Sequence, residues 1–137
     1  MPPTSHSELR YRDFFENVPV GLFAVSPEGR ILDANPAMVA ILRYPSREQL
    51  LAADITEFQL DRADAARMWS ILLGGGEIRD LEVQLAREDG STVWLLTSAS
   101  AARDEEGRVL YYRGAVEDIT GRKQAEEAAL ELSLIHI

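Results

Sequence analysis

Few side chains in this chain of 137 residues have the types and spacing that chemistry needs. There is no cysteine, so thiol nucleophiles, thiolate metal sites and disulfides are all excluded. The two histidines, His6 and His136, stand at opposite ends of the sequence. Acid–base catalysis needs two positioned titratable groups in one cleft, and the best remaining candidates are Asp33 and Tyr112. Asp33 fits a polar strand position better, so a small enzyme using Asp33 or Tyr112 is the weakest of our hypotheses.

The charge of the chain excludes two classes of partner. The formal net charge is −9 and the pI is about 4.7, which argues against nucleic acid and against anionic membrane surfaces. The hydrophobic fraction of 46% is normal for one globular domain, and no apolar run approaches the length of a membrane span. We therefore expect a cytoplasmic domain whose partners include no nucleic acid and, in this fragment, no membrane.

Local patterns predict the order of the elements that must position any site. Turn signals separate segments with the period of two that is typical of strands from segments with helical spacing. Asn35 and Ser46 are predicted N-caps, because their side-chain oxygens can accept N–H groups of a first helical turn. Strands on either side of a helical insert predict an α+β domain with a five-stranded antiparallel sheet. The predicted helices are Glu8–Asn17, one starting at Pro36, one after Ser46, Arg62–Leu73 and one from Arg122; the predicted strands are Gly21–Val25, Arg30–Ala34, Ile78–Ala86, Thr92–Ala102 and Val109–Glu117.

Four stretches, in this order, resemble the PAS domain family of bacterial sensory and interaction modules. They are GLFAVSPEGRILDANPAM at 21–38, LRYPSREQLLAADI at 42–55, REDGSTVWLLTSASAARDEEGRVLYYRG at 87–114 and VEDITGRKQAEE at 116–127. The resemblance implies a five-stranded antiparallel PAS sheet with helices on one face, an N-terminal cap helix and a C-terminal coiled-coil-like helix. It divides the chain into a tail and cap helix at 1–18, a PAS core at 19–118 and a signalling helix at 119–137.

The resemblance also implies a small cavity between one face of the sheet and the middle helices. Alternate residues of a strand share a face, so the inward positions can be assigned by alternation. Thr97 and Tyr112 carry the only hydrogen-bonding side chains among these positions, and each hydroxyl needs a backbone carbonyl, a water or a bound molecule as partner. The expected lining residues are Phe23, Val25, Met38, Met68, Leu72, Val83, Leu85, Leu95, Thr97, Ala99, Tyr112, Gly114 and Val116.

The cofactors known in the family can be compared with these residues. Haem-binding members usually ligate iron through a histidine of the longest middle helix, and Arg62–Leu73 contains none. Met68 on that helix is interpreted as core rather than as a haem ligand. The flavin-photoadduct and coumarate-binding branches both need a cysteine, which this chain lacks. We therefore expect no metal and no such cofactor, while a non-adduct flavin and a neutral or apolar small ligand stay open.

The opposite face of the sheet and the last helix are expected to meet a partner. An apolar group there needs cover by the N-terminal helix, by a second subunit, or by both. This group consists of Trp94, Leu96 and Tyr111, with Phe14 and Phe15 on the N-terminal helix. The resemblance makes a homodimer the expected assembly. The last helix carries a stripe with the 3-4-3 spacing of a coiled coil, formed by Ala125, Ala128, Leu132 and Ile135.

We therefore expect a non-enzymatic sensor or dimerisation module of a bacterial signal-transduction protein, such as a two-component histidine kinase or a diguanylate cyclase. Asp118, Ile119 and Thr120 join the last strand to the last helix, and would relay the state of a ligand or partner to a C-terminal effector domain. The alternative is a ligand-free scaffold for protein interactions. The segment Ser133–Ile137 departs from the preceding pattern, and we expect it to be a truncation or processing scar.

Overall fold

The structure is a computed structural model that describes residues 6–54, 62–87 and 89–135. The five strands form one antiparallel sheet in the order β2-β1-β5-β4-β3. The predicted α+β class and five-stranded antiparallel sheet are therefore confirmed. The elements are α1 (His6–Asn17), β1 (Gly21–Val25), β2 (Ile31–Ala34), α2 (Pro36–Leu42), α3 (Arg47–Leu51), α4 (Arg62–Leu73), β3 (Ile78–Ala86), β4 (Thr92–Arg103), β5 (Val109–Asp118) and α5 (Thr120–Ile135).

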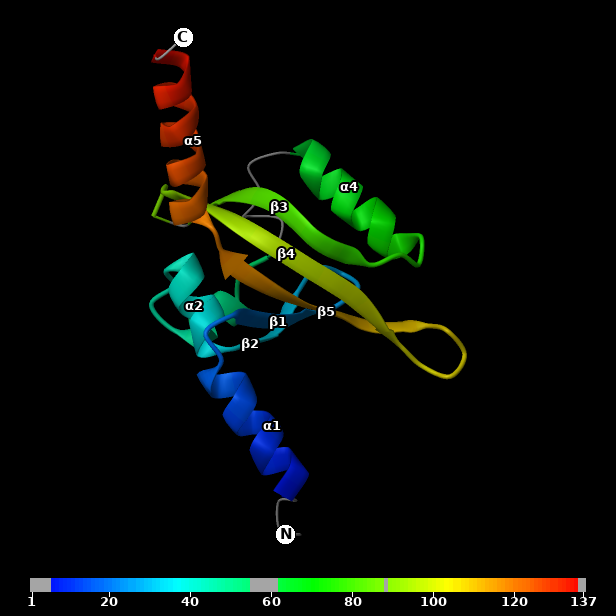
Figure 1. Cartoon of the computed structure of the whole chain (residues 1–137). Helices are drawn as coiled ribbons and strands as arrows, with labels where there is room; N and C mark the ends of the chain where they lie inside the picture. The colour runs from blue at the N-terminus through cyan, green and yellow to red at the C-terminus, as the bar shows by residue number, and fades with distance from the viewer. Residues whose placement is uncertain (1–5, 55–61, 88, 136–137) are drawn as a thin grey trace.

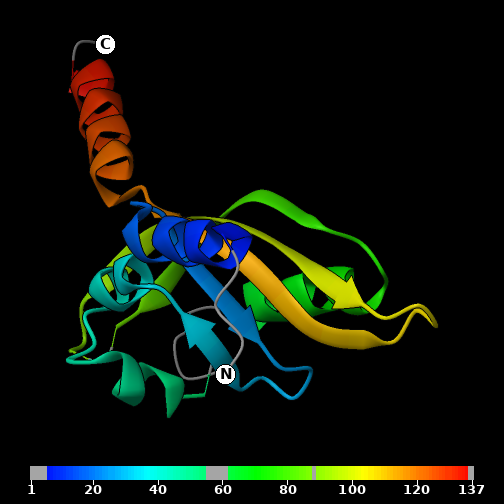
Figure 2. The same ribbon diagram turned by 90° about the horizontal axis from the view of Figure 1, so that it is seen from below.

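The sheet has an inner face that the middle helices cover. Met38 and Leu42 of α2 and Leu50 of α3 pack there against inward residues of the strands. α4 covers the inner face farther along β4 and β5, where its Leu72 packs with Ile78 and Tyr112. Helix α5 instead extends away from the sheet in both views (Figures 1 and 2), and α1 projects from the other side of the domain in Figure 1. None of the helices in the described ranges is long and apolar enough to cross a membrane.

The observed bounds differ from the predicted ones for local reasons. α1 begins at His6 rather than Glu8. β2 begins at Ile31 rather than Arg30, because Arg30 forms an isolated bridge with Asp54. α5 begins at Thr120 rather than Arg122, since the Thr120 N–H donates to Asp118 Oδ1 directly after β5 (2.9 Å). The last strand therefore passes into the last helix with Ile119 as the only residue between them.

Asn35 joins the start of α2 to three other parts of the chain. Its side chain is fully buried, and Oδ1 accepts the Met38 N–H at 2.9 Å, which confirms the predicted N-cap. The same oxygen accepts the Leu22 N–H of β1 at 2.9 Å. The side-chain amide donates to the carbonyls of Phe15 at 3.0 Å and Val20 at 2.9 Å. One buried amide thus uses four hydrogen bonds to fix α1, β1 and α2 together.

Replacing Asn35 with alanine should therefore cost far more than the loss of a helix cap. We expect Asn35→Ala to lower the free energy of unfolding by about 3 kcal/mol, because two N–H groups and two carbonyls lose a buried partner. Ser46→Ala is the matched control: Ser46 caps α3 through the Gln49 N–H (3.2 Å), and its loss should cost about 1 kcal/mol. Urea unfolding of both variants measures the two costs. Equal costs would show that the contacts of Asn35 beyond the cap contribute nothing.

Candidate functional site

An apolar cavity of about 60 Å³ lies between the inner face of the sheet and helices α2, α3 and α4. The strands supply its floor, and the helices supply Met38 and Leu42, Leu50 and Met68 respectively. Alternation along the strands explains the floor, since every second residue of β1, β3, β4 and β5 points inward. The described lining residues are Phe23, Val25, Ile31, Met38, Leu42, Leu50, Met68, Val83, Leu85, Leu95, Thr97 and Val116.

The sequence patterns missed three residues of this lining. Leu42 and Leu50 lie one or two turns along short helices, and Ile31 lies at the start of a strand of four residues. The helical stripe that contains Met38 was a signal for Leu42. Ile31 and Leu50 could be placed only by knowing that β2 and α3 close the same cavity. The remaining residues of the lining are among those predicted.

Four predicted residues do not line the cavity. Leu72, Ala99 and Tyr112 belong to a neighbouring cluster beneath α4, where the Trp69 and Tyr112 rings meet edge to face at 5.4 Å. The prediction failed because β4 and β5 are long, with 12 and 10 residues, and their inward face continues past the cavity. Gly114 lies beneath the ring of Phe23. A Cβ built on Gly114 would stand 2.5 Å from Phe23 Cζ and 2.7 Å from the Ser98 carbonyl oxygen, so only glycine fits there.

Thr97 is the only residue with a side-chain oxygen or nitrogen among the described lining residues. It is 3% exposed, and its hydroxyl Oγ1 is buried without a hydrogen-bond partner. An unpartnered buried hydroxyl costs about 1–3 kcal/mol, and native proteins contain few such groups. The cavity is therefore an apolar space with a single polar contact point.

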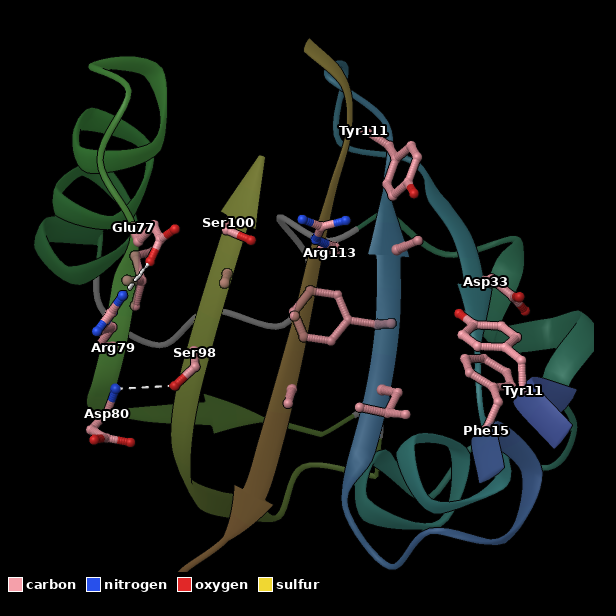
Figure 3. Close-up of a pocket in the computed structure, with 17 residues that line it drawn as sticks. Tyr11, Phe15, Asp33, Glu77, Arg79, Asp80, Ser98, Ser100, Tyr111 and Arg113 are labelled. Carbon is pink, nitrogen blue, oxygen red and sulfur yellow. Dashed lines mark hydrogen bonds and ion pairs between the residues drawn. The ribbon is translucent and has the colours of Figure 1, made fainter. Parts of the chain in front are cut away.

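A second, much larger hollow of about 1030 Å³ lies open on the outer face of the sheet (Figure 3). Tyr11 and Phe15 of α1 stack at one side of it, with ring centroids 6.3 Å apart. Its other side is polar, and there Arg79 pairs with Glu77 at 2.9 Å. Because this hollow is broad and open, we interpret it as a surface for macromolecular contact rather than as a small-molecule site.

The connection from β5 to α5 is fixed by contacts to the start of β4. Ile119 is buried at 4% exposure, and its N–H donates to the Trp94 carbonyl at 2.9 Å. The Trp94 N–H in turn donates to the Thr120 hydroxyl at 3.0 Å. Asp118 Oδ1 accepts the Thr120 N–H, one of the amides at the start of α5 that have no partner within the helix. The three residues predicted as a relay thus hold the first turn of α5 against the sheet.

Charged side chains add a second attachment for the first turn of α5. Glu82 of β3 accepts hydrogen bonds from Lys123 Nζ at 2.7 Å and from Arg122 at 2.6 Å. The hydrogen bond from Lys123 lowers the pKa of the Glu82 carboxyl below its ordinary value, and Glu82 in turn raises the pKa of Lys123. Lys123 Nζ also lies 4.9 Å from the centre of the Trp94 ring, a cation–π contact.

The residues that were expected to meet a partner lie in several different environments in the structure. Lys123 of α5 lies over the Trp94 ring, whereas the expected cover was the N-terminal helix, a second subunit or both. Leu96 and Tyr111 are half-buried on the outer face, and Tyr111 borders the open hollow together with Phe15. Phe14 is 62% exposed. None of the residues of α5 is buried, so Ala125, Ala128 and Leu132 all face solvent.

Asp33 and Tyr112, the candidates for acid–base catalysis, lie in different parts of the fold. Asp33 forms an ion pair with Arg47 of α3 and accepts the Ala34 N–H at 2.9 Å, whereas Tyr112 is buried beneath α4. The described residues contain no group of three or more histidine, cysteine, aspartate or glutamate side chains that could hold a metal ion. The two groups required for acid–base chemistry are therefore not brought together.

Two curated relatives are similar to nearly the whole chain. The sensor histidine kinase TmoS of Ectopseudomonas mendocina is 32% identical over 130 residues, which cover 92% of this chain and 13% of that protein. The probable diguanylate cyclase DgcE of Escherichia coli (strain K12) is 27% identical over 131 residues, which cover 93% of this chain and 12% of that protein. The chain thus spans only a small part of the length of these relatives.

A solved structure and a family model agree with these matches. A domain of the sensory box sensor histidine kinase/response regulator from Geobacter sulfurreducens matches with a TM-score of 0.66 at 27% identity, over 82% of this chain and 94% of that chain. The family model described as PAS domain matches residues 19–121, which include every strand and helices α2, α3 and α4. This chain therefore belongs to the PAS domain family.

Proposed function

We propose that this PAS domain is a non-catalytic sensor module that binds a small, neutral or apolar molecule in the inner cavity. The observation that carries the proposal is the unpartnered Thr97 hydroxyl in an otherwise apolar lining. Water is a poor partner for it, because a buried water normally needs two to four polar contacts and Thr97 offers one. A small organic molecule with one polar group would satisfy the hydroxyl and fill the apolar space.

The size of the cavity favours a small occupant over a flavin. Drug-sized and cofactor sites usually have volumes of about 300–1,000 Å³. The inner cavity has about 60 Å³, so a flavin would require a large displacement of α2, α3 or α4. Among the described lining residues, the only candidate haem ligands are the thioethers of Met38 and Met68, and we interpret both as packing side chains.

We further propose that the occupied domain acts through α5 on an effector domain of histidine kinase or diguanylate cyclase type. The names of the two relatives support this choice of effector, as does the small share of their length that the chain spans. A ligand can change the position of α5 only by as much as it binds one conformation more tightly than the other. A ligand-free interaction scaffold is the alternative, and the experiments below distinguish the two.

We propose a homodimer in which α5 pairs with the same helix of a second copy. All its residues are solvent-exposed or half-buried, although the helix carries four large apolar side chains, Leu130, Leu132, Leu134 and Ile135. The stripe from Ala125 to Ile135 has coiled-coil spacing, which a parallel partner helix would cover. The second copy would also cover the exposed Phe14 and the open outer hollow.

Thr97→Val should reveal whether the hydroxyl lacks an internal partner. We expect the ligand-free variant to be more stable by about 1 kcal/mol, because the substitution removes an unsatisfied buried group at nearly constant shape. Thr92→Val is the matched control on the same strand, where the side chain is exposed and the change should stay within about 0.5 kcal/mol. Chemical unfolding measures both. A clear loss of stability in Thr97→Val would mean that the hydroxyl is bonded within the protein.

Ligand binding can be tested on protein purified under native conditions. Extraction followed by mass spectrometry, together with thermal shifts against a panel of small neutral metabolites, should identify a molecule that raises the melting temperature. Thr97→Val should bind that molecule about tenfold more weakly, because one buried hydrogen bond is lost. If nothing is extracted and no compound shifts the melting temperature, the scaffold alternative replaces the sensor.

The proposed helix pairing predicts different effects for two leucines of α5. Leu132→Asp places a charge on the coiled-coil stripe and should convert the dimer to a monomer in sedimentation. Leu134→Asp places the same charge on the opposite side of the helix, where Leu134 is 63% exposed, and should leave the mass unchanged. The pairing is refuted if both variants keep the mass of the unmodified protein or if that protein is itself monomeric.

The attachment of α5 through Glu82 should depend on pH. The pKa of the Glu82 carboxyl is lowered in the folded protein. Its contribution to stability is therefore complete above the ordinary carboxyl pKa of 4.5, and it is lost as the pH falls through the lowered pKa. Hydrogen exchange at the first-turn amides of α5 should therefore quicken, relative to the intrinsic rate, below that pH. Glu82→Gln should remove this extra pH dependence, whereas Glu127→Gln, an exposed control on α5, should keep it. Identical profiles in both variants would contradict the role of Glu82.

A further inference from the structure

The side chain of Arg87, the residue that follows β3, is only 8% exposed and forms an ion pair with Asp118. Burying a guanidinium is costly unless its N–H groups find acceptors. Its hydrogen-bond acceptors lie at the end of α2 and in the hairpin between β3 and β4, and it also forms an ion pair with Asp118 at the end of β5. The position of Arg87 is therefore tied to all three.

The first contact completes the C-terminal end of α2. The Arg43 N–H donates to the Ala40 carbonyl and the Tyr44 N–H to the Val39 carbonyl, both at 3.1 Å, as is usual where a helix ends in a left-handed residue. The next carbonyl, that of Ile41, accepts Arg87 Nε at 2.8 Å. A cation at this end also interacts favourably with the helix dipole. Any movement of α2 along or across its axis must therefore move or break this bond.

The second contact reaches the start of α5. Arg87 Nη2 lies 3.7 Å from Asp118 Oδ2, while the other carboxylate oxygen, Oδ1, accepts the Thr120 N–H. Asp118 thus stands between the guanidinium and the first turn of the output helix. The remaining nitrogen, Nη1, contacts the Ser91 hydroxyl at 3.3 Å and the Thr92 carbonyl at 3.4 Å, which fixes the guanidinium in the hairpin.

Helix α2, which Arg87 contacts, also forms a wall of the cavity. Met38 and Leu42 line it, and Ile41, whose carbonyl binds Arg87, immediately precedes Leu42. A cavity of about 60 Å³ accepts little more than a few waters without expanding, so a larger occupant must displace a wall. α2 has only seven residues and is held at its two ends by Asn35 and Arg87.

We propose that Arg87 is the positioning residue that couples displacement of α2 to the orientation of α5. The inference rests on the proposed sensor function and specifies its regulation: occupancy moves α2, the Ile41 carbonyl moves Arg87, and Arg87 moves Asp118 at the start of α5. A purely structural arginine would stabilise the domain equally, but its loss would not uncouple the cavity from the helix.

The test uses distances within one chain and needs no ligand. Because the sequence has no cysteine, Glu28→Cys in the β1–β2 turn and Glu131→Cys on α5 provide two unique sites for spin labels, both exposed. Labelled chain diluted with unlabelled chain reports the distance between the core and α5 in one copy. Val25→Phe replaces a residue that lines the cavity and is only 2% exposed. Val25 pairs with Tyr112 of β5, six residues before Asp118, so the substitution does not alter Asp118 directly. It overfills the cavity and so imitates an occupant.

Val25→Phe should shift the distance distribution when Arg87 is present. The shift should fall by at least about threefold in Arg87→Gln, a reduction that a double-mutant cycle separates from the effect of either change alone. Arg43→Gln is the matched control, since Arg43 contacts Asp89 and Ser91 of the same hairpin, at 3.4 Å each, but has no contact with Asp118. The control should keep the full shift.

If Val25→Phe or Arg87→Gln prevents folding, milder substitutions at the same two positions test the proposal. Val25→Leu fills less of the cavity, and Arg87→Lys keeps the charge but cannot reach all the acceptors of a planar guanidinium, so it should also reduce the shift. The proposal is overturned if the shift is equal with and without Arg87, if Arg43→Gln abolishes it to the same degree, or if Val25→Phe and Val25→Leu cause none. Failure to find a ligand would refute the sensor function while leaving this coupling measurement intact.

Discussion

The packing of the domain depends on one buried amide, that of Asn35. Burial of a polar side chain is unfavourable unless each of its donors and acceptors is bonded, and Asn35 meets this condition with partners from α1, β1 and α2. Its geometry fixes where α2 begins and therefore where Met38 and Leu42 face the sheet. The cavity wall, the direction of the chain leaving α1 and the first strand are consequently set by the same four hydrogen bonds.

The described structure also places two kinds of attachment around the first turn of α5. One is buried and largely made of backbone bonds, through Ile119, Thr120 and Trp94. The other is charged and partly exposed, through Glu82, Arg122 and Lys123. Exposed ion pairs contribute little and are screened by salt, whereas buried hydrogen bonds hold a fixed geometry. The buried set therefore determines where the helix leaves the sheet, and the charged set adjusts how firmly its first turn is held.

Contacts that are local in the sequence could be predicted, and contacts between distant segments could not. The caps at Asn35 and Ser46 were predictable because each bonds a residue three positions later. The order of the elements along the chain and the α+β class followed from periodicity and from the four family-like stretches. The other partners of Asn35 lie 13 to 20 residues away, and Ile41 lies 46 residues from Arg87, so no spacing rule indicated them. Tyr112 was misplaced because alternation assigns a face of the sheet but not which helix covers it.

The length of α5 gives its attachment a mechanical consequence. Its 16 residues span about 24 Å at 1.5 Å per residue, and in the described residues its ion pairs with the sheet come from its first turn. A tilt of about 10° at that turn would displace the far end by about 4 Å, most of the 5.4 Å pitch of an α-helix. Displacements too small to disturb the packing around the cavity are thus amplified to the scale at which one helix changes its register against another.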